Sequence, residues 1–369
     1  MSSATRPGDV VGTDDRVAAL AQTLRDSPGP LLPRAAGTKD ALSTPPAGAS
    51  PLDVRALNGV IDYDPAELTF TAMAATPVRE IVELLAAQRQ YLPFDPPWAD
   101  AGASLGGTVA AGVSGPGSYR HGGVRDFILG VRLLDGSGRL ISGGGKVVKN
   151  AAGFDLPKLM VGTLGRMGIL ISMSFKVFPL PEAWTTLRVK TEGLTDSLTI
   201  ATRLARSSFE LETLDLDPPR ELWLRLGGRA AVLARRADRL ARFVDRPTEQ
   251  LTGSDDVRRW QEARELTWVG PGSALVRVAT TPGKLTALDA ALAAAGAQRR
   301  YSRGGNAAWL AWPEAHPLTR LDQILKELRL AGTRLRGGDG PPLLGPPQGG
   351  AFAARVRAVF DPHDRFVEI

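Results

Sequence analysis

The chain has 369 residues and 43% hydrophobic content, which is enough for two domains with folded cores. It contains no cysteine, and this excludes a disulfide, a cysteine-ligated zinc ion or an iron–sulfur cluster held by this polypeptide. The net charge of +6 is spread along the chain without a basic patch, which suits an anionic ligand and argues against nucleic acid as a partner. No leader-like segment and no run of 18 apolar residues occurs, so we expect a cytoplasmic protein with no transmembrane segment.

The first predicted elements are a helix and a strand that leads into a turn of small residues. Apolar residues recur at helical spacing over residues 16–24, and the strand begins at Leu31. In the turn that follows, Gly37, Thr38 and Lys39 can offer N–H, hydroxyl and ammonium groups to a phosphate. A plain surface turn is the alternative interpretation.

Further strands are predicted at residues 56–61 and 68–72. A helix is predicted to start with Thr76 as its N-cap and Pro77 at its first position. The expected apolar face of this helix comprises Val78, Ile81, Val82 and Leu85. After the helix, Trp98 ends the segment Phe-Asp-Pro-Pro-Trp, and taken alone it is typical of a packed core or lid residue.

Residues 99–177 organise the chain. Between Gly102 and Gly168 lie 18 of its 41 glycines, interleaved with aliphatic residues, which indicates a folded segment and not a linker. Glycine lets backbone N–H groups approach an anion such as a pyrophosphate, and tight turns in a β-rich domain are the alternative. The glycines proposed for such a loop system are Gly106, Gly107, Gly112 and Gly115. A hairpin is predicted over residues 127–142, around an Asp-Gly-Ser-Gly turn, and a β-rich run over residues 169–178.

Two common phosphate-binding motifs are absent. The pattern G-x-x-x-x-G-K-[ST] fails at Lys146, because Leu140 occupies the position of its first glycine and Val147 replaces the hydroxyl residue. Each G-x-G pair in the stretch lacks the third glycine of G-x-G-x-x-G. The sequence therefore predicts neither a P-loop nor a nicotinamide-binding Rossmann fold.

Four other segments carry a family resemblance: LGGTVAAGVSG at 105–115, VRDFILGVRLLDG at 124–136, KNAAGFDL at 149–156 and GTLGRMGIL at 162–170. Together they resemble the FAD-binding domain of the vanillyl-alcohol oxidase and p-cresol methylhydroxylase (PCMH) superfamily, and within it the E subunits of bacterial glycolate oxidases. The resemblance covers about the first half of the chain. It implies FAD as the cofactor, held non-covalently, because the turn at residues 35–39 lacks the histidine through which some relatives attach the flavin.

The resemblance also implies which segments hold FAD. The turn at residues 35–39 would be the first pyrophosphate loop, although alanines stand where glycines are common. Residues 94–98 would lie beside the flavin ring, Lys149 and Asn150 near the ring or the ribityl chain, and residues 162–168 near the adenine. The implied cofactor-binding residues are Ala36, Gly37, Thr38, Lys39, Pro96, Pro97, Ser104, Leu105, Gly106, Gly107, Thr108, Ala111, Gly112, Ser114, Gly115, Tyr119, Gly122, Val124, Lys149, Asn150, Gly153, Asp155, Gly168 and Ile169.

Beyond residue 182, strand-like and helix-like runs alternate. Strands are predicted at residues 186–190, 210–216, 222–226, 274–279 and 307–312, and helices at 198–206, 229–243, 282–294, 318–330 and 351–360. This pattern predicts an α+β cap domain with an antiparallel sheet. The expected fold class is α+β: a two-subdomain PCMH-type FAD-binding domain over residues 1–182, the cap over 183–345, and a C-terminal segment over 346–369. The resemblance implies that this segment returns to the FAD-binding domain, although its ending departs from the Asn-Pro-Gly-Arg-like end of the family.

Few residues suit catalysis. The three histidines, His121, His316 and His363, form no metal-binding cluster in the sequence, so we expect no metal site, and the catalytic residues remain unknown. His121 lies among the glycines and is interpreted as a turn residue near the pyrophosphate. The region of Ser114 has no G-x-S-x-G elbow, which gives hydrolase chemistry no support.

The leading hypothesis is an FAD-binding subunit of a glycolate oxidase-like complex. In it, a homologous catalytic FAD subunit would oxidise a small 2-hydroxy acid such as glycolate or D-lactate to the 2-oxo acid, and an iron–sulfur subunit would take the electrons. The partners would give the cytoplasmic chain peripheral contact with the inner membrane. One alternative is a self-sufficient FAD-dependent oxidoreductase whose substrate site uses cap arginines such as Arg303, and another is a non-catalytic scaffold without FAD. The arginines Arg235, Arg236, Arg239 and Arg242 share helical spacing and suggest either a docking face or a solvated helix face.

Overall fold

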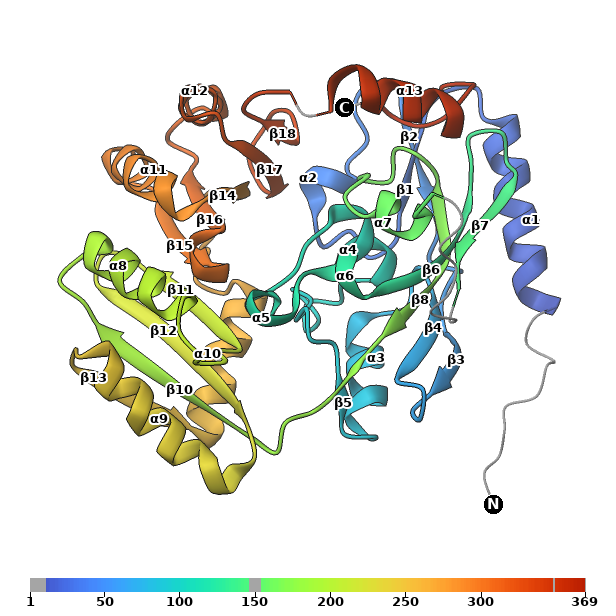
Figure 1. The fold of residues 1–369 in the computed structure, drawn as a ribbon. Helices are drawn as coiled ribbons and strands as arrows, with labels where there is room; N and C mark the ends of the chain where they lie inside the picture. Colours follow the sequence, from blue (N-terminus) through green and yellow to red (C-terminus); the bar gives the residue numbers. More distant parts are fainter. Residues whose placement is uncertain (1–10, 146–153, 348, 369) are drawn as a thin grey trace.

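The computed structural model describes residues 11–145, 154–347 and 349–368, and the chain forms two parts that lie side by side (Figure 1). The N-terminal part contains the first nine labelled strands. The cap contains the remaining strands, and the final helix, α13, returns to the N-terminal part (Figure 1). The predicted α+β class is confirmed.

The N-terminal part begins with a small parallel pair of strands. Its elements are α1 (Val11–Asp26), β1 (Leu31–Arg34), α2 (Asp40–Ser43) and β2 (Ser50–Asp53). Leu31 of β1 lies opposite Ser50 of β2 in parallel register. Leu24 of α1 is fully buried in the core beside this pair, as expected for the apolar stripe of an amphipathic helix. The predicted helix over residues 16–24 and the strand at Leu31 are both confirmed.

A five-stranded antiparallel sheet, in the order β3-β4-β8-β6-β7, forms the centre of this part. Its strands are β3 (Val60–Asp64), β4 (Thr69–Met73), β6 (Ile128–Leu134), β7 (Leu140–Gly144) and β8 (Ile169–Lys176), and β5 (Gln90–Tyr91) pairs separately with β9 (Phe178–Pro179). The helices beside the sheet are α3 (Val78–Ala86), α4 (Leu105–Ala111), α5 (Ser118–His121), α6 (Val124–Phe127) and α7 (Leu156–Met160). The predicted hairpin is confirmed: the carboxylate of Asp135 accepts hydrogen bonds from the backbone N–H groups of Ser137 and Arg139 in its turn.

Two local predictions are wrong because tertiary contacts override local preference. Residues 56–59 are not a strand, since β3 begins at Val60 and Leu57 fills the core from a turn. The N-cap of α3 is Pro77, and the hydroxyl of Thr76 bonds instead to the backbone N–H and carbonyl of Gly59. The apolar face of α3 is also narrower than predicted, because Val82 is 41% exposed.

The cap is a nine-stranded antiparallel sheet in the order β13-β10-β12-β11-β15-β16-β14-β17-β18. Its strands are β10 (Ala183–Lys190), β11 (Thr213–Asp217), β12 (Glu221–Gly228), β13 (Thr248–Thr252), β14 (Ser273–Ala279), β15 (Gln298–Ser302), β16 (Ala307–Pro313), β17 (Ala331–Arg336) and β18 (Leu343–Leu344). Its helices are α8 (Leu194–Ala205), α9 (Ala230–Val244), α10 (Gly253–Glu265), α11 (Pro282–Ala294), α12 (Leu318–Leu328) and the short 3-10 turn η2 (Arg303–Gly305).

All five strands predicted for the cap are present, but others were missed. The sequence did not predict β13, β15, β17, β18 or the helix α10. The strands β13, β15 and β17 are rich in polar and arginine residues, and α10 carries mostly charged residues, so hydrophobic periodicity does not reveal them.

The two faces of the cap sheet have different neighbours. Helices α8, α9, α11 and α12 cover one face, where Val276 and Leu310 join the main core. Side chains alternate between the faces of a strand, so Leu275 and Trp309 point the other way and pack against Trp98 of the N-terminal part. This apolar contact fixes the cap beside α4 and the β1–α2 turn.

The end of the chain closes the N-terminal part. After α13 (Gly350–Phe360), Phe366 is 1% exposed and forms an isolated parallel bridge with Leu31. The backbone carbonyl of Arg365 accepts a hydrogen bond of 2.8 Å from the N–H of Leu31, and buried Asp361 accepts from the N–H of Phe366. The last residues therefore complete the core around β1 and β2.

We predict that Phe366→Ala destabilises the protein by about 3–5 kcal/mol, because it opens a cavity in a closed core. Urea unfolding followed by circular dichroism measures the change. Phe352→Ala is the matched control, since Phe352 on α13 is 56% exposed and its removal should change the unfolding free energy by less than about 0.5 kcal/mol. Equal effects of the two variants would show that the C-terminal residues do not complete this core.

Candidate functional site

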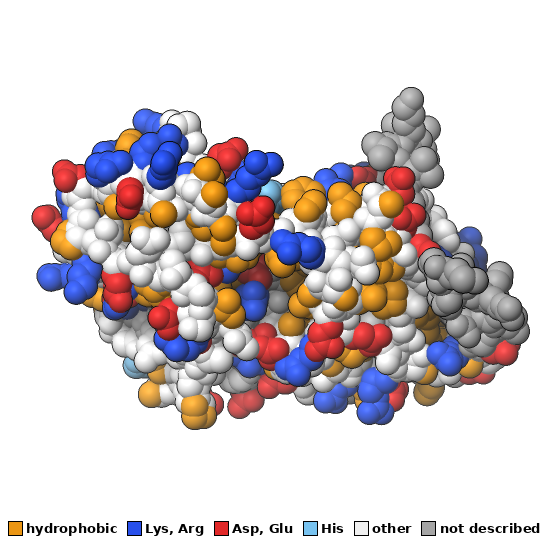
Figure 2. All heavy atoms as spheres, turned by 90° about the horizontal axis from the view of Figure 1, so that it is seen from below, with side chains coloured by type: hydrophobic (Ala, Val, Ile, Leu, Met, Phe, Trp, Pro, Cys, Tyr) orange, Lys and Arg blue, Asp and Glu red, His pale blue; other side chains and the backbone are white. Residues whose placement is uncertain are grey.

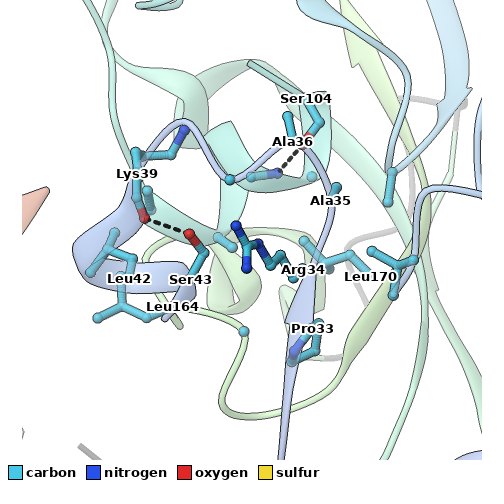
Figure 3. A pocket seen from close by; sticks show the side chains of 18 of the residues that line it. Pro33, Arg34, Ala35, Ala36, Lys39, Leu42, Ser43, Ser104, Leu164 and Leu170 are labelled. Atoms are coloured by element: carbon cyan, nitrogen blue, oxygen red, sulfur yellow. Dashed lines mark hydrogen bonds between the residues drawn. The ribbon is translucent and has the colours of Figure 1, made fainter. Parts of the chain in front are cut away.

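A pocket lies where β1 ends, between the β1–α2 turn, α4 and the start of β8 (Figure 3). Residues 33–39 form one wall, Ser104, Gly106 and Gly107 a second, and residues 164–170 contribute a third. Leu42, Leu164 and Leu170 supply apolar surface to it. The pocket thus combines a polar turn with hydrophobic walls, as small-molecule sites commonly do.

The β1–α2 turn places two cationic side chains at this pocket. Gly37 has a φ of +70°, a left-handed conformation that favours glycine, and lets the chain turn sharply after Arg34. The backbone carbonyl of Lys39 accepts a hydrogen bond of 2.8 Å from the hydroxyl of Ser43, which ties the turn to α2. Arg34 is exposed, whereas Lys39 is 6% exposed.

Lys39 is a buried cation without an anionic partner. Its ammonium group bonds to the hydroxyl of Thr38 at 3.3 Å, and in the described part of the chain no carboxylate lies within ion-pair distance of it. Burial, together with the smaller effect of the nearby positive charge of Arg336, lowers the pKa of Lys39 to about 8. At neutral pH the group is still mostly charged. A buried charge of this kind is costly unless something neutralises it, so the pocket favours an anion.

The glycines of α4 have separate roles. A Cβ on Gly106 would lie 2.8 Å from the carbonyl oxygen of Ala74, so the sheet itself requires this glycine. A Cβ on Gly107 would lie 3.0 Å from the hydroxyl oxygen of Ser104 and 3.8 Å from the ammonium nitrogen of Lys39. The bare backbone of Gly107 therefore leaves space directly beside the buried cation.

Two of the other proposed glycines are explained by the fold. Gly112 ends α4 with a φ of +61°, and a Cβ there would lie 3.2 Å from the Cα of Gly162. The N–H of Gly115 donates to the carbonyl of Asp95 at 2.9 Å, and a Cβ on Gly115 would overlap that oxygen. Neither glycine lines the pocket, so here the tight-turn interpretation accounts for them.

The structure brings part of the predicted set together. The predicted residues that line the pocket are Ala36, Gly37, Thr38, Lys39, Ser104, Gly106, Gly107, Ala111, Gly168 and Ile169. Leu105 and Thr108 are buried within α4 behind it. The predicted residues that do not line it are Pro96, Pro97, Gly112, Ser114, Gly115, Tyr119, Gly122, Val124 and Asp155. Lys149, Asn150 and Gly153 lie outside the described residues.

Several of these other residues have structural partners. The hydroxyl of Ser114 accepts from the N–H of Val124 at 2.9 Å, and Asp155 caps α7. Tyr119 packs against the cap core. His121, which we interpreted as a turn residue near the pyrophosphate, lies against Glu212 of the cap at 3.2 Å and does not line the pocket.

Sequence reasoning missed some pocket residues. Arg34 and Leu170 line the pocket but are not among the residues proposed from the sequence, whereas Gly165 belongs to the segment 162–168 expected near the adenine. Arg34 is the last residue of a strand, and its position directly before a turn of small residues is the signal that marks it. Leu170 belongs to the predicted β-rich run over residues 169–178, and strand periodicity does not reveal which face of a strand meets a ligand.

A second polar cluster lies where the cap faces residues 97 and 115–116. The carboxylate of Asp217 accepts from Arg259 at 3.1 Å and pairs with Arg300 at 3.4 Å. Burial raises the pKa of neighbouring Asp215 to about 8, although Arg259 acts against that rise. Among the residues that the structure describes, buried N–H donors of Arg259, Arg300 and Trp268 find no hydrogen-bond partner. A hydrogen-bond acceptor such as a carboxylate would satisfy them.

Some of the arginines proposed as a docking face on α9 make contacts within the cap. Arg236 donates to the carbonyl of Gly227 at 2.7 Å, and the guanidinium of Arg239 lies 5.1 Å from the ring centroid of Phe209. Arg235 and Arg242 are exposed. Seen from below, basic and acidic side chains are interspersed over the molecule (Figure 2).

The comparisons agree with the chemistry of the first pocket. Residues 10–144 match the family model described as an FAD binding domain. They contain the β1–α2 turn and α4, and the buried ammonium with the open backbone beside it fits the phosphate of such a cofactor. This chain contains an FAD-binding domain. It is similar to glycolate oxidase subunit GlcE of Escherichia coli (strain K12), with 36% identity over 243 residues, which is 64% of each chain.

More distant similarities show the fold. Glycolate oxidase subunit GlcD of Bacillus subtilis (strain 168) is 27% identical over 52% of this chain and 41% of that protein. The solved structure of alkyldihydroxyacetonephosphate synthase superposes with a TM-score of 0.69 at 13% identity, covering 96% of this chain and 76% of that one. The matches span less than two thirds of either glycolate oxidase subunit. Among the described helices of this chain, none has the length and apolarity to cross a membrane.

We predict that Lys39→Met stabilises the FAD-free protein at pH 7. The lowered pKa means that the folded state disfavours the charged form, at a cost on the order of 3 kcal/mol, although methionine recovers only part of it. The cost is full below pH about 8, where Lys39 is protonated in both states, and disappears as the pH rises from about 8 past 10.5, where both states are neutral. Urea unfolding of wild type and variant across this range should show the gain at pH 7 shrinking toward pH 10.5.

Lys190→Met is the control for this prediction, because Lys190 is exposed and its replacement should change stability by less than about 0.5 kcal/mol. A loss of stability in FAD-free Lys39→Met at pH 7 would show that the folded protein already neutralises the ammonium group.

Proposed function

We propose that this chain is the FAD-binding subunit of a glycolate oxidase-like complex and that the pocket at the β1–α2 turn holds the FAD pyrophosphate. The observation that carries the proposal is the buried, unneutralised ammonium of Lys39 beside the open backbone of Gly107. A pyrophosphate supplies the missing negative charge, and charge-assisted hydrogen bonds to phosphate are strong. When bound, FAD supplies two-electron redox chemistry to the complex.

The residues of the pocket have different proposed roles in binding. Lys39 and Thr38 donate charge and hydrogen bonds toward phosphate. Ser104, whose hydroxyl accepts from the N–H of Gly107 at 3.3 Å, holds the start of α4 in place. Leu42 and Leu164 exclude water from the site and so strengthen these electrostatic contacts.

The partners follow from what this polypeptide lacks. It has no cysteine, so an iron–sulfur cluster that accepts electrons from the flavin would belong to another chain. The similarity to a protein named as a glycolate oxidase subunit supports a homologous catalytic FAD subunit as the second partner. The exposed arginines Arg235 and Arg242 of α9 are the proposed docking face for an acidic partner surface. Contact with the membrane would come through these partners.

The second polar cluster favours an alternative, a self-sufficient FAD-dependent oxidoreductase. Unpartnered donors of Arg300 and Trp268 suit the carboxylate of glycolate or D-lactate. Arg303, which we named from the sequence for this role, adjoins the cluster, and its backbone N–H bonds to Asp215. The remaining alternative, a scaffold without FAD, has no support from the pocket, because it leaves Lys39 without an anion.

We predict that Gly107→Val weakens FAD binding at least about tenfold, or ~1.4 kcal/mol, because its methyl groups would occupy the space beside the Lys39 ammonium. The variant should purify colourless, and fluorescence titration with FAD gives the affinity. Gly283→Val is the matched control, since a Cβ on this helical glycine of α11 meets nothing within 4 Å. Wild-type affinity and stoichiometric FAD in Gly107→Val would refute the placement of the pyrophosphate.

We also predict that the isolated chain binds FAD yet oxidises glycolate or D-lactate poorly with an artificial electron acceptor. Activity should appear when the homologous FAD subunit and the iron–sulfur subunit are co-expressed and co-purified with it. The reason is that the substrate-oxidising flavin and the electron acceptor reside on those partners in the proposed complex. Efficient steady-state oxidation by the lone chain would establish the self-sufficient enzyme in place of the subunit.

A further inference from the structure

Two cations from different parts of the protein meet at one buried indole ring. The ammonium nitrogen of Lys39 lies 5.3 Å from the ring centroid of Trp98, and the guanidinium carbon of Arg336 lies 5.2 Å from the same centroid. Trp98 is 1% exposed and packs edge-on against Trp309 of the cap. Lys39 comes from the β1–α2 turn and lines the pocket, and Arg336 comes from the last position of β17, outside the pocket lining, so the junction between the two parts carries both charges.

Neither cation is neutralised in the described part of the chain. The side chain of Arg336 makes no hydrogen bond or ion pair there, and the acidic groups that influence it are Asp40 and Glu265, both beyond ion-pair distance. One carboxylate oxygen of Asp40 accepts instead from the N–H of Gly337, the residue after β17, at 3.1 Å. That hydrogen bond holds the end of β17 against α2, so Arg336 and Lys39 stay at the same ring of Trp98.

We infer that Arg336 is a phosphate-binding residue supplied by the cap, and that it forms with Lys39 a two-sided cationic clamp on the diphosphate of FAD. The inference rests on the pyrophosphate placement proposed above. The charges of Lys39 and Arg336 repel each other at a junction of low dielectric constant. A diphosphate of charge −2 that contacts both groups would attract each of them and offset this repulsion. A diphosphate suits such a clamp better than a single carboxylate does, because its negative charge extends over several oxygens.

The clamp has a consequence beyond affinity. One cation belongs to the N-terminal part and the other to the cap, so the bound diphosphate would hold the two parts together. A ligand that binds only when both parts are in contact stabilises that contact by linkage. We therefore expect FAD, and also ADP, to protect the connection at residues 180–182 from proteolysis.

The competing explanation is that Arg336 only packs on Trp98. A cation–π contact alone would stabilise the fold and leave diphosphate affinity unchanged. The two explanations differ in their ligand dependence. The clamp predicts a loss specific to ligands with a diphosphate, whereas the packing role predicts a loss of thermal stability without a selective loss of such ligands.

The test is a titration of FAD-free full-length protein with FAD, ADP and riboflavin, with Arg336→Met, Arg336→Lys and Arg355→Met compared with wild type. Arg355 on α13 is exposed and serves as the control for loss of one positive charge. We expect Arg336→Met to weaken FAD and ADP binding by about tenfold to a hundredfold, with partial rescue in Arg336→Lys. Riboflavin, which has no phosphate, should bind all four proteins equally, and Arg355→Met should match wild type.

The outcomes separate the two levels of the proposal. No binding of FAD or ADP by the wild-type protein would overturn the placement of the cofactor. Normal binding by wild type together with equal FAD and ADP affinity in Arg336→Met would overturn the clamp alone. If Arg336→Met does not fold, as judged by circular dichroism, Arg336→Gln replaces it with the same expected loss. Protection of residues 180–182 by ADP should be present in wild type and reduced in the Met or Gln variant.

Discussion

The buried ammonium of Lys39 is the constraint on which this structure depends. Three separate elements surround it: the β1–α2 turn that carries it, the start of α4, and Trp98 at the junction with the cap. Removing a charge from water is costly, and no carboxylate among the described residues offsets this cost. The fold keeps the cation in place through the Asp40–Gly337 hydrogen bond and the apolar contact between Trp98 and Trp309. Such a site favours an anion, and in the free protein the buried charge of Lys39 lowers the stability of the fold.

The glycine-rich stretch shows how one residue type serves two purposes. Gly106 and Gly115 let backbone segments of the protein approach each other, because any Cβ there would overlap a carbonyl oxygen of Ala74 or Asp95. Gly107 instead leaves space beside Lys39. The density of glycine therefore reflects close packing around the site as much as the site itself, and only the direction of each missing Cβ distinguishes the two roles.

The cap contributes more than cover. The sheet face that α10 covers carries Leu275 and Trp309, which pack on the N-terminal part, and the polar cluster around Asp217 beside them. This apolar packing holds the two parts together. Beside it, the buried charged residues of the cap face residues 97 and 115–116 of the N-terminal part. The C-terminal segment then returns, and Phe366 joins the core around β1, so the proposed pyrophosphate loop follows a strand that the C-terminal residues hold in place.

The sequence by itself determined the α+β class, the hairpin around Asp135, the turn from Gly37 to Lys39 and the FAD-binding family. These depend on local patterns: apolar periodicity, a turn formed by Asp and Gly, and short motifs. The tertiary structure alone decided that Thr76 bonds to Gly59 in place of capping a helix, and that the arginine-rich β15 and β17 are strands. It also decided that Arg336 meets Lys39 across Trp98. The physical reason is that burial and charge pairing depend on residues hundreds of positions apart, which no local pattern records.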